Sequence, residues 1–446
     1  MLTNPVLVSV VVMMALSLAK LNVIVALLVS AVVAGLLAEI PLVKTEAVVD
    51  GEAVTIDGVI DILIGGMGGG SGTALNYILL GALAVAISQT GIAGVLGRLI
   101  IEKVKGRTYF FLFIIAIIAS LSQNLIPVHI AFIPILIPPL LRAMNKMQLD
   151  RRAAAVALTF GLKAPYIAIP AGYGIIFQEI IQEQLKLNGV EVALNSVWKV
   201  LMLPAAGMLV GLIVAVLFTY SKKRQYSDIN IVEDETAQIQ SFNKQHFFAL
   251  LAAVAAFGVQ VQFESLPLGA LLGLTILVVT QTIRWTEINQ LMNSGIGLMG
   301  FIAFVMLVAS GYGAVIRETG GVQELVDATA SIVAGNQPLG AIMMLLVGLV
   351  ITMGIGTSFG TIPILAVIYA PLGLSLGFSP LAIVALVGTA AALGDAGSPA
   401  SDSTLGPTAG LNADGQHDHI WDTVVPTFLH FNIPLIIFGF IAAMIF

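Results

Sequence analysis

The chain has 446 residues, of which 58% are hydrophobic and 10% charged, with a net charge of −6 and a mean hydropathy of +1.01. Soluble proteins carry about 25% charged residues, so this composition excludes an ordinary soluble protein. The absence of cysteine excludes disulfides, thiolate metal sites and cysteine nucleophiles. Apolar runs long enough to cross a bilayer recur from end to end, so we expect an all-α polytopic membrane protein.

The first half of the chain is predicted to hold five apolar spans. These are Pro5–Leu18, Asn22–Ala38, Asn76–Ala93, Ala153–Phe177 (broken near Pro170–Gly174) and Val200–Phe218. Glu39–Ile62 is polar and ends in an amphipathic piece expected on the membrane surface. The glycine-rich run Gly65–Gly72 predicts close helix packing or a hinge, because no Gly-Lys-Ser/Thr follows as in a phosphate loop. Gln178–Lys199 is expected to be a polar surface segment.

One further apolar segment, Tyr109–Leu141, is interrupted by polar residues at Ser120–Pro127. Basic residues flank the segment at both ends. Both ends are therefore placed on the cytoplasmic side, which predicts a re-entrant hairpin. Gln123 and Asn124 lie at the polar tip and are candidate ligands for a cation or substrate. His129, beside the tip, is either a packed histidine or a proton carrier.

A hydrophilic linker at residues 221–245 divides the chain into residues 1–220, with the first repeat, and residues 246–446, with the second repeat and the last span. The spans expected after the linker are Phe247–Phe263, Leu268–Thr282, Gly297–Ile316, Pro380–Leu393 and Val424–Phe446. Leu339–Leu372 is again a broken segment, interrupted at Gly354–Thr361. The remaining segments are an amphipathic piece, a polar stretch and a loop, at Thr286–Ser294, Arg317–Gln337 and Pro407–Asp422.

The two halves repeat. A shift of 229 positions superimposes Ile133–Leu136 on Ile362–Leu365 and Pro170-Ala171 on Pro399-Ala400. Counting spans gives the repeats opposite orientations and places both termini outside, and the absence of Lys and Arg after Arg317 agrees. Inverted repeats with paired broken elements are typical of alternating-access secondary transporters, whose binding site lies where the breaks meet.

The stretch Leu393–Thr404 carries the chemistry of the predicted site. An isolated aspartate at membrane depth costs about 2.5–3.5 kcal/mol, so Asp395 and Asp402 require a function. Carboxylates, hydroxyls and carbonyls freed by a broken helix are the ligands that suit a hard cation. The expected charged ligands are Asp395 and Asp402, and the expected neutral donors are Thr357, Ser358, Thr361, Asn124 and Gln123.

Other interpretations of these residues stay open. Thr357 and Ser358 also fit simple packing between helices, and Asp402 could cap the helix that continues through Thr404. Lys163 could be a permanent counter-charge to Asp395 or Asp402, a titrating partner, or a residue that snorkels to the membrane surface. The group His417, Asp418, His419 and Asp422 is either a solvated or gating loop or a metal cluster.

Three C-terminal segments resemble the signature segments of NhaC-type sodium/proton antiporters. They are Gly356–Thr361, Gly394–Thr404 and His417–Pro426, which match the family in order and internal spacing. The family belongs to the ion transporter superfamily, so the resemblance implies inverted repeats, re-entrant hairpins, a dimerising scaffold and a moving transport domain. It also implies that a sodium or substrate site includes Ser398, Ser401 and Thr404, with Na⁺ at Asp395, Asp402, Ser401 and Thr357. The family histidine and cysteine that follow the first aspartate are Ala396 and Gly397 here.

Together these observations predict a sodium-coupled secondary transporter of the Na⁺/H⁺ antiporter type. The alternative is a sodium-coupled symporter of an amino acid or small organic anion. An enzyme or channel is not expected, because no nucleotide loop, nucleophile triad or channel filter occurs. We expect no cofactor besides transported Na⁺ or H⁺, no nucleic-acid partner, a homodimer, and a location in the plasma membrane (in bacteria, the inner membrane).

Overall fold

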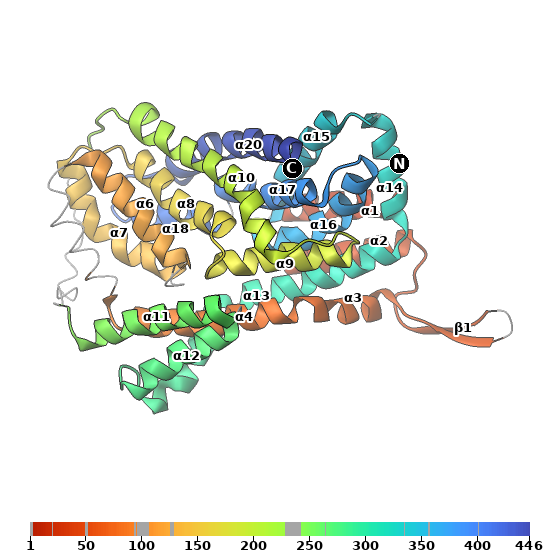
Figure 1. Ribbon diagram of the computed structural model, residues 1–446, viewed down its shortest axis with the longest axis horizontal. Helices are drawn as coiled ribbons and strands as arrows, with labels where there is room; N and C mark the ends of the chain where they lie inside the picture. Colours follow the sequence, from red (N-terminus) through yellow and green to blue (C-terminus); the bar gives the residue numbers. More distant parts are fainter. Residues whose placement is uncertain are drawn as a thin grey trace.

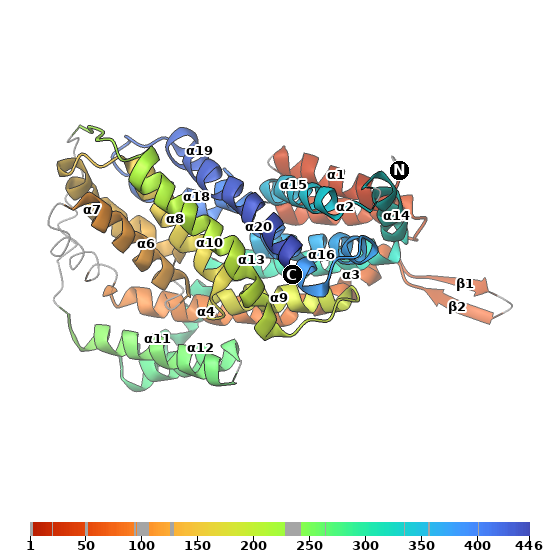
Figure 2. The same cartoon turned by 45° about the horizontal axis from the view of Figure 1, so that its top comes forward.

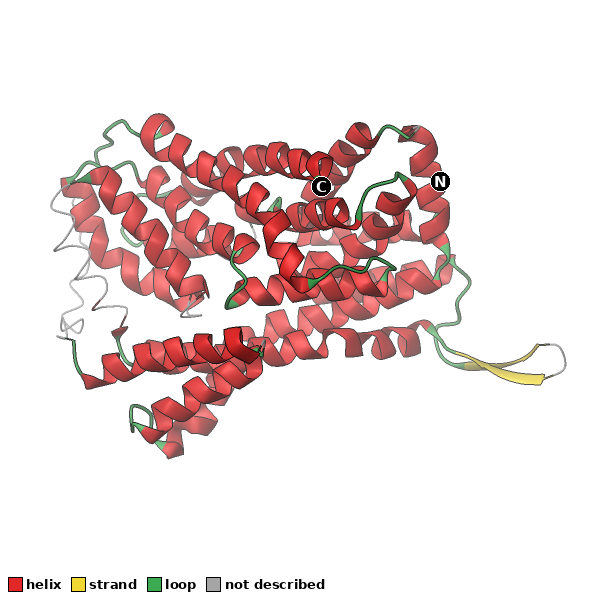
Figure 3. Cartoon of the chain, in the orientation of Figure 1, coloured by secondary structure: helices red, strands yellow, loops and turns green. Residues whose placement is uncertain are grey.

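The computed structural model describes residues 3–19, 21–49, 52–92, 95, 107–124, 129–227, 242–263, 265–333, 335–355, 357–399 and 401–446. The all-α prediction is confirmed, because helices dominate throughout (Figure 3). Within the described ranges the one sheet is a two-stranded antiparallel hairpin, β1 (Thr45–Val49) with β2 (Glu52–Ile56). This hairpin was not predicted, and it projects from one end of the molecule (Figure 1).

The helices of the first half follow the predicted spans closely. They are α1 (Pro5–Leu18), α2 (Val23–Leu37), α3 (Val59–Met67), η1 (Gly68–Gly70), α4 (Ser71–Gln89), α6 (Thr108–Asn124), α7 (His129–Lys146), α8 (Arg151–Ala168), α9 (Tyr173–Leu187), α10 (Leu194–Val214) and η2 (Ala215–Thr219). The first repeat therefore contains a hairpin, α6–α7, followed by a broken helix, α8–α9.

The second half has the same succession of elements. It comprises α11 (Lys244–Phe263), α12 (Leu266–Val279), η3 (Trp285–Glu287), α13 (Ile288–Glu318), α14 (Gly321–Val333), α15 (Gln337–Ile355), α16 (Ser358–Ser375), α17 (Pro380–Ala392), η4 (Asp395–Gly397), α18 (Asp402–Leu411), η5 (His419–Val424), α19 (Val425–Thr427), η6 (Phe428–Asn432) and α20 (Ile433–Ile445). The last four form one helix, residues 419–445.

Several helices of the described chain are long and apolar enough to cross a membrane. Five qualify alone, and two bent pairs, at Val59–Gln89 and Arg151–Leu187, raise the number to seven if each pair counts as one span. The bends measure 50° and 49°. The first bend lies at the glycine-rich run, and a Cβ on Gly66 would lie 2.4 Å from Ala314 Cβ, so the run provides the predicted close packing.

The helix boundaries confirm the duplication. Shifting α7 (His129–Lys146) by 229 positions gives the bounds of α16, Ser358–Ser375, and shifting the end of α4 gives the end of α13. The hairpins α6–α7 and α15–α16 lie toward opposite ends of the molecule, and the broken helices lie between them (Figures 1 and 2). The repeat therefore brings both broken helices to the centre.

The packing of α3 and α4 against α13 shows that the repeats are inverted. A Cβ on Gly66 would lie 3.0 Å from Gly311 Cα, and a Cβ on Gly295 would lie 2.5 Å from Ala82 N. Gly295 and Gly311 are the repeat equivalents of Gly66 and Ala82, so exchanging the two halves reproduces the same contact. Residues early in one segment therefore contact residues late in the other. The two segments are antiparallel, as expected for elements related by a two-fold axis.

The structure corrects five sequence-based expectations. The predicted piece Thr286–Ser294 starts in η3 and continues from Ile288 into the 31-residue helix α13, which also contains Gly297–Ile316. The amphipathic piece before Gly65 is α3, whose Val59 and Leu63 are buried in protein. The segment from Gln178 starts inside α9 and is partly buried, and the polar segment after Arg317 contains the helix α14.

The fifth correction concerns the loop expected at Pro407–Asp422. It is shorter than predicted, because α18 runs to Leu411 and η5 starts at His419. Pro407 is tolerated inside α18, and the actual connection is the short segment 412–418.

Candidate functional site

Asp395 occupies the break that follows α17. The helix ends at Ala392, and Gly394 turns the chain with φ of +77°, a left-handed conformation that favours glycine. A Cβ on Gly394 would lie 2.7 Å from the Met353 backbone nitrogen on α15, so glycine also permits a close backbone contact. The Gly394 N–H donates to Asn432 Oδ1 at 3.2 Å. Asp395 is thereby held in the interior, with 1% of its surface exposed.

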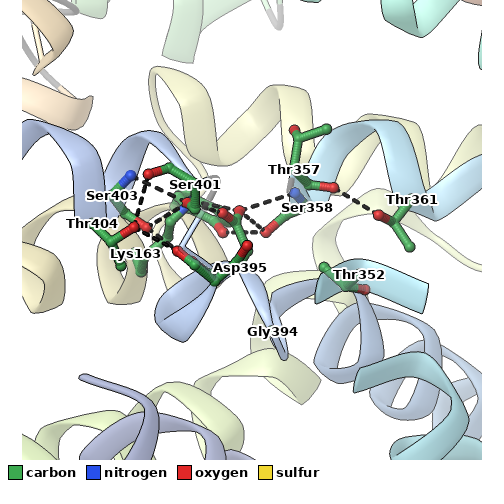
Figure 4. A network of polar contacts seen from close by, with 12 residues as sticks. Lys163, Thr352, Thr357, Ser358, Thr361, Gly394, Asp395, Ser401, Ser403 and Thr404 are labelled. Carbon is green, nitrogen blue, oxygen red and sulfur yellow. Dashed lines mark hydrogen bonds and ion pairs between the residues drawn. The ribbon is translucent and has the colours of Figure 1, made fainter. Parts of the chain in front are cut away.

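The Asp395 carboxylate is held by groups from three elements (Figure 4). Lys163 Nζ donates to Oδ2 at 2.5 Å, and the Ser358 N–H donates to the same oxygen at 2.9 Å. The Ser358 and Ser401 hydroxyls donate to Oδ2 and Oδ1 respectively. Ser358 is the first residue of α16, so a helix N-terminus also faces the negative charge.

Lys163 comes from α8, in the other repeat. It is 8% exposed and forms an ion pair with Asp395, so it does not extend to the membrane surface. Its ammonium also lies 5.2 Å from the centre of the Tyr166 ring, within the range of a cation–π contact. Of the three roles considered for Lys163, the structure has the geometry of a counter-charge to Asp395.

Asp402 differs from Asp395 in its contacts. Ser401, not Asp402, caps α18 by accepting from the Ser403 N–H, so Asp402 is the first residue of the helix. No residue in the described ranges hydrogen-bonds or ion-pairs with its carboxylate. The residue is exposed to solvent, yet protein surrounds it on most sides, with Lys163 and Asp395 within electrostatic reach.

The other predicted ligands divide into two groups. Ser358 and Ser401 contact Asp395, as described. The Thr361 hydroxyl donates to the Thr357 carbonyl at 2.7 Å, and the Thr404 hydroxyl donates to the Ser398 carbonyl at 2.6 Å. These two hydroxyls therefore stabilise the helix starts and do not contact the carboxylates. Ser398 Oγ donates to the Met353 carbonyl at 3.4 Å.

The predicted donors Gln123 and Asn124 end α6, but their side chains lie outside the described part of the structure, as does that of His129.

Two residues of the site, Ser403 and Tyr166, were not among the predicted ligands. Ser403 Oγ lies 2.8 Å from Ser401 Oγ and donates to the Asp395 carbonyl at 3.0 Å. Tyr166 Oη lies 2.7 Å from Ser358 Oγ, so it contacts Asp395 through one hydroxyl. The repeat alignment contained the signal for Tyr166, because this residue is the equivalent of Asp395.

A second polar cluster joins the start of α8 to segment 412–418. The Arg151 and Asp414 side chains are 0% and 1% exposed and pair through two hydrogen bonds, of 2.7 and 2.5 Å. Burial acts to raise the pKa of Asp414, but the hydrogen bonds and charge of Arg151 outweigh it and hold this pKa below its usual range. Arg224 pairs with Asp422 at 2.7 Å. These two ion pairs connect the segment after α18 and the start of η5 to the start of α8 and to Arg224, which follows η2.

The histidines at 417 and 419 bind hydroxyls and backbone. His417 Nε2 lies 2.7 Å from Thr423 Oγ1, and His419 lies 2.8 Å from Thr408 Oγ1 and 2.9 Å from the Pro399 carbonyl. Burial lowers the pKa of His417 to about 4. Within the described residues, no group of three or more His, Asp or Glu side chains has the geometry of a metal site. The structure thus gives no support to the metal-cluster interpretation.

Comparison with known proteins gives consistent results. The model of the Na⁺/H⁺ antiporter family matches residues 157–440, and a Na⁺-H⁺ antiporter family model matches residues 4–104. An uncharacterised membrane protein of Vibrio parahaemolyticus is 49% identical, covering 99% of this chain and all of its own. A putative amino acid transporter of Bacillus subtilis, YuiF, is 47% identical, covering 85% of this chain and 89% of its own.

Two solved structures share the fold. MtrF of Neisseria gonorrhoeae, described as representing a class of antimetabolite efflux pumps, has a TM-score of 0.61 and 14% identity, covering 98% of this chain and 94% of its own. The YdaH transporter of Alcanivorax borkumensis has a TM-score of 0.61 and 13% identity, covering 99% of this chain and 98% of its own. These likenesses concern the fold.

Proposed function

Because the chain belongs to the Na⁺/H⁺ antiporter family, we propose that this membrane transporter exchanges sodium for protons at the Asp395–Lys163 pair. The observation that carries the proposal is the ammonium of Lys163 on the buried carboxylate of Asp395. A sodium ion that takes this carboxylate as a ligand must displace the ammonium, so the two cations compete for one group. An ammonium left without its counter-charge at membrane depth is costly.

Competition of this kind couples sodium to protons. When sodium occupies Asp395, the Lys163 ammonium releases a proton and becomes a neutral amine. When sodium leaves, Lys163 takes up a proton and the ion pair with Asp395 forms again. The Ser358 and Ser401 hydroxyls already point at the two carboxylate oxygens, and each has lone pairs for a cation. Asp402 is exposed and has no hydrogen-bond or ion-pair partner among the described residues, and it binds the incoming ion first. The chain needs no further cofactor for this exchange and acts as a transporter, not an enzyme.

The contacts between segments support the topology expected from the sequence. Arg224 and Arg151, at the expected cytoplasmic side, meet Asp422 and Asp414, which the inverted second repeat places on the same side. On the expected external side, Asn4 Nδ2 donates to the Gly321 carbonyl at 2.8 Å. The C-terminal Phe446 carbonyl accepts from Ser379 Oγ at 2.7 Å in the same way. We therefore infer external termini in the plasma membrane, the inner membrane of a bacterium.

The exposed apolar surface of α11 and α12 supports a further inference. Phe263 and Val279 are 66% and 76% exposed. We infer that this surface meets lipid or a second copy in a homodimer. A nucleic-acid partner is not part of the proposal.

Proteoliposomes with an internal pH dye test the exchange. An imposed sodium gradient should move protons with no organic solute present, and Asp395→Asn and Lys163→Gln should each abolish this movement. Asp327→Asn and Lys199→Gln, on exposed residues away from the site, serve as matched controls and should retain it. Wild-type protein that moves no protons would refute sodium/proton exchange, and a fully active Lys163→Gln variant would refute the role of the pair.

A second candidate is sodium-coupled transport of an amino acid or small organic anion. It is favoured by the unpaired Asp402 carboxylate and by the 47% identity to a protein named as a putative amino acid transporter. Sodium-dependent uptake of a labelled amino acid, without proton movement in the absence of solute, would support this function over exchange.

A further inference from the structure

A cavity of about 710 Å³ lies where the ends of three helices meet. The end of α4, the start of α11 and the connection from α12 through η3 surround it. Its lining includes three glutamines, an ion pair and a tryptophan, which are Gln89, Gln245, Gln281, Arg284 with Glu287, and Trp285. None of these residues belongs to the site around Asp395, so the cavity is a separate feature of the molecule.

The cavity lies at the expected cytoplasmic surface of the membrane. Helix α13 starts directly after η3 and ends at Glu318, close to the contact between Asn4 and Gly321 on the expected external side. The start of α13, with η3, is therefore at the cytoplasmic end of this span. Trp285 in η3 is 77% exposed, and tryptophan is enriched where helices meet the membrane surface.

Apolar surface begins beside the cavity on two helices. Val279, two residues before Gln281, is 76% exposed, and Phe247, two residues after Gln245, is 53% exposed. Helices α11 and α12 lie at one edge of the molecule (Figures 1 and 2), so this surface is available to lipid chains. A polar cavity at the membrane surface, bordered by exposed apolar helices, provides the two kinds of contact that a phospholipid makes.

The ion pair in the cavity presents both charges to a ligand. Arg284 Nε donates to Glu287 Oε1 at 2.9 Å, a contact that uses one of the five guanidinium N–H bonds. The arginine and glutamate side chains are 80% and 34% exposed. A guanidinium binds phosphate oxygens through two parallel N–H bonds, and a carboxylate accepts from an ammonium. The pair therefore complements a headgroup in which a phosphate and a primary ammonium lie close together.

Gln281 has a backbone conformation that is unfavourable for glutamine. Its φ of +54° lies in the left-handed region, directly after the end of α12. Glycine is the usual residue in this conformation after a helix, because a Cβ there is strained. The turn is closed by backbone alone, with the Ile283 N–H donating to the Leu277 carbonyl at 3.1 Å. A glutamine at a position suited to glycine indicates a function for its side chain, which lines the cavity.

We propose that this cavity binds the headgroup of a phospholipid that carries a phosphate and a primary ammonium, as phosphatidylethanolamine does. Arg284 binds the phosphate, Glu287 binds the ammonium, and the Gln281 amide donates to an oxygen of the headgroup. The acyl chains lie along the exposed apolar surface of α11 and α12. This lipid site goes beyond the proposed exchange of sodium for protons and does not depend on it.

The experiment adds phospholipids with identical acyl chains to the delipidated full-length protein in detergent and follows its melting temperature against lipid concentration. Phosphatidylethanolamine should act at lower concentrations than phosphatidylglycerol, whose headgroup has no ammonium. Glu287→Gln keeps an acceptor for the Arg284 backbone N–H and should remove this preference. Arg284→Gln should weaken binding of both lipids about tenfold or more, as expected for a lost charge-assisted hydrogen bond. Glycerophosphoethanolamine, the same headgroup without acyl chains, should have no effect at equal concentrations.

Gln281→Gly separates ligand binding from folding. Glycine removes the left-handed strain, so the lipid-free variant should melt at a higher temperature than the wild type. Loss of the amide should nevertheless weaken phosphatidylethanolamine binding about two- to tenfold, the range for one hydrogen bond. A purely structural role for Gln281 would leave lipid binding unchanged, and that result would overturn its place in the site.

Lys44→Gln and Asp57→Asn are the matched controls. These residues form an exposed ion pair, with Nζ 3.0 Å from Oδ1, at the base of the β1–β2 hairpin. Both variants should retain the preference for phosphatidylethanolamine. Equal action of the two lipids on the wild type, an unchanged preference in Glu287→Gln, or equal stabilisation by glycerophosphoethanolamine would overturn the proposal.

Discussion

The break that positions Asp395 depends on Gly394. Gly415 has nearly the same backbone conformation but open surroundings, so alanine substitutions at the two positions can be compared. Gly394 and Gly415 have φ of +77° and +75°, so alanine at either position costs about 1–2 kcal/mol from the left-handed backbone alone. They differ in surroundings. A Cβ at Gly394 would lie 2.7 Å from Met353 N and 2.8 Å from the Leu349 carbonyl, whereas a Cβ at Gly415 meets nothing within 4 Å.

Gly394→Ala should therefore destabilise the protein by about 1–3 kcal/mol more than Gly415→Ala, the usual cost of overpacking. The backbone atoms that the new methyl group meets cannot rotate away as a side chain could. Relief of the overlap must move the break itself, and Asp395 is the next residue. We expect Gly394→Ala to lose sodium-driven proton movement and Gly415→Ala to retain it.

The assay compares apparent melting temperatures in detergent with proton movement in proteoliposomes for the two variants. A lower melting temperature and lost transport for Gly394→Ala alone would agree with the geometry. Equal melting temperatures and equal transport in both variants would show that the contact with α15 does not constrain the break.

Two further predictions concern the cluster at segment 412–418. Arg151→Met should lower the free energy of unfolding by about 3–5 kcal/mol, because it leaves the buried Asp414 carboxylate without its ion-pair partner. The double variant Arg151→Met with Asp414→Leu should recover much of this loss. Equal melting temperatures of the single and double variants would contradict this prediction. His417 has a pKa lowered from 6.5 to about 4, so the unfolded chain takes up its proton first and the fold should lose stability as pH falls from 6.5 toward 4. His417→Gln should flatten this part of the curve of melting temperature against pH, and an unchanged curve would contradict the assignment.

The helices of this chain were predictable because the signal for them is local. Apolar runs, glycine and proline breaks and the repeat of 229 positions indicated α7, α16 and the broken helices. The hairpin β1–β2 also had a local signal that was missed, the Asp50-Gly51 pair between two short runs rich in valine and alanine. The continuity of α13 was missed because Asn293 and Ser294 resemble a boundary in sequence but lie inside the helix.

The candidate site was predictable in its carboxylates and less so in their partners. Asp395 and Asp402 stand out because they are acids in apolar surroundings. Arg151 looked like a surface residue, because charge alone does not reveal a partner at Asp414, more than 200 positions away. The different states of the two aspartates, one paired and one unpaired, also depend on such distant contacts. Only the fold brings Lys163 to Asp395 and leaves Asp402 alone.

The two-fold contact of α3 and α4 with α13 has a consequence for how this transporter arose. Gly66 meets Gly311 as Gly295 meets Ala82, which is the self-complementary pattern of a symmetric dimer interface, here folded into a single chain. In a dimer of identical halves, every substitution appears twice, so an aspartate at one symmetry position requires an aspartate at the other. Fusion into one gene removed that constraint. It allowed aspartates at positions 395 and 402 while the equivalent positions, 166 and 173, hold tyrosines, and an ancestor with two identical halves could not have built such a site.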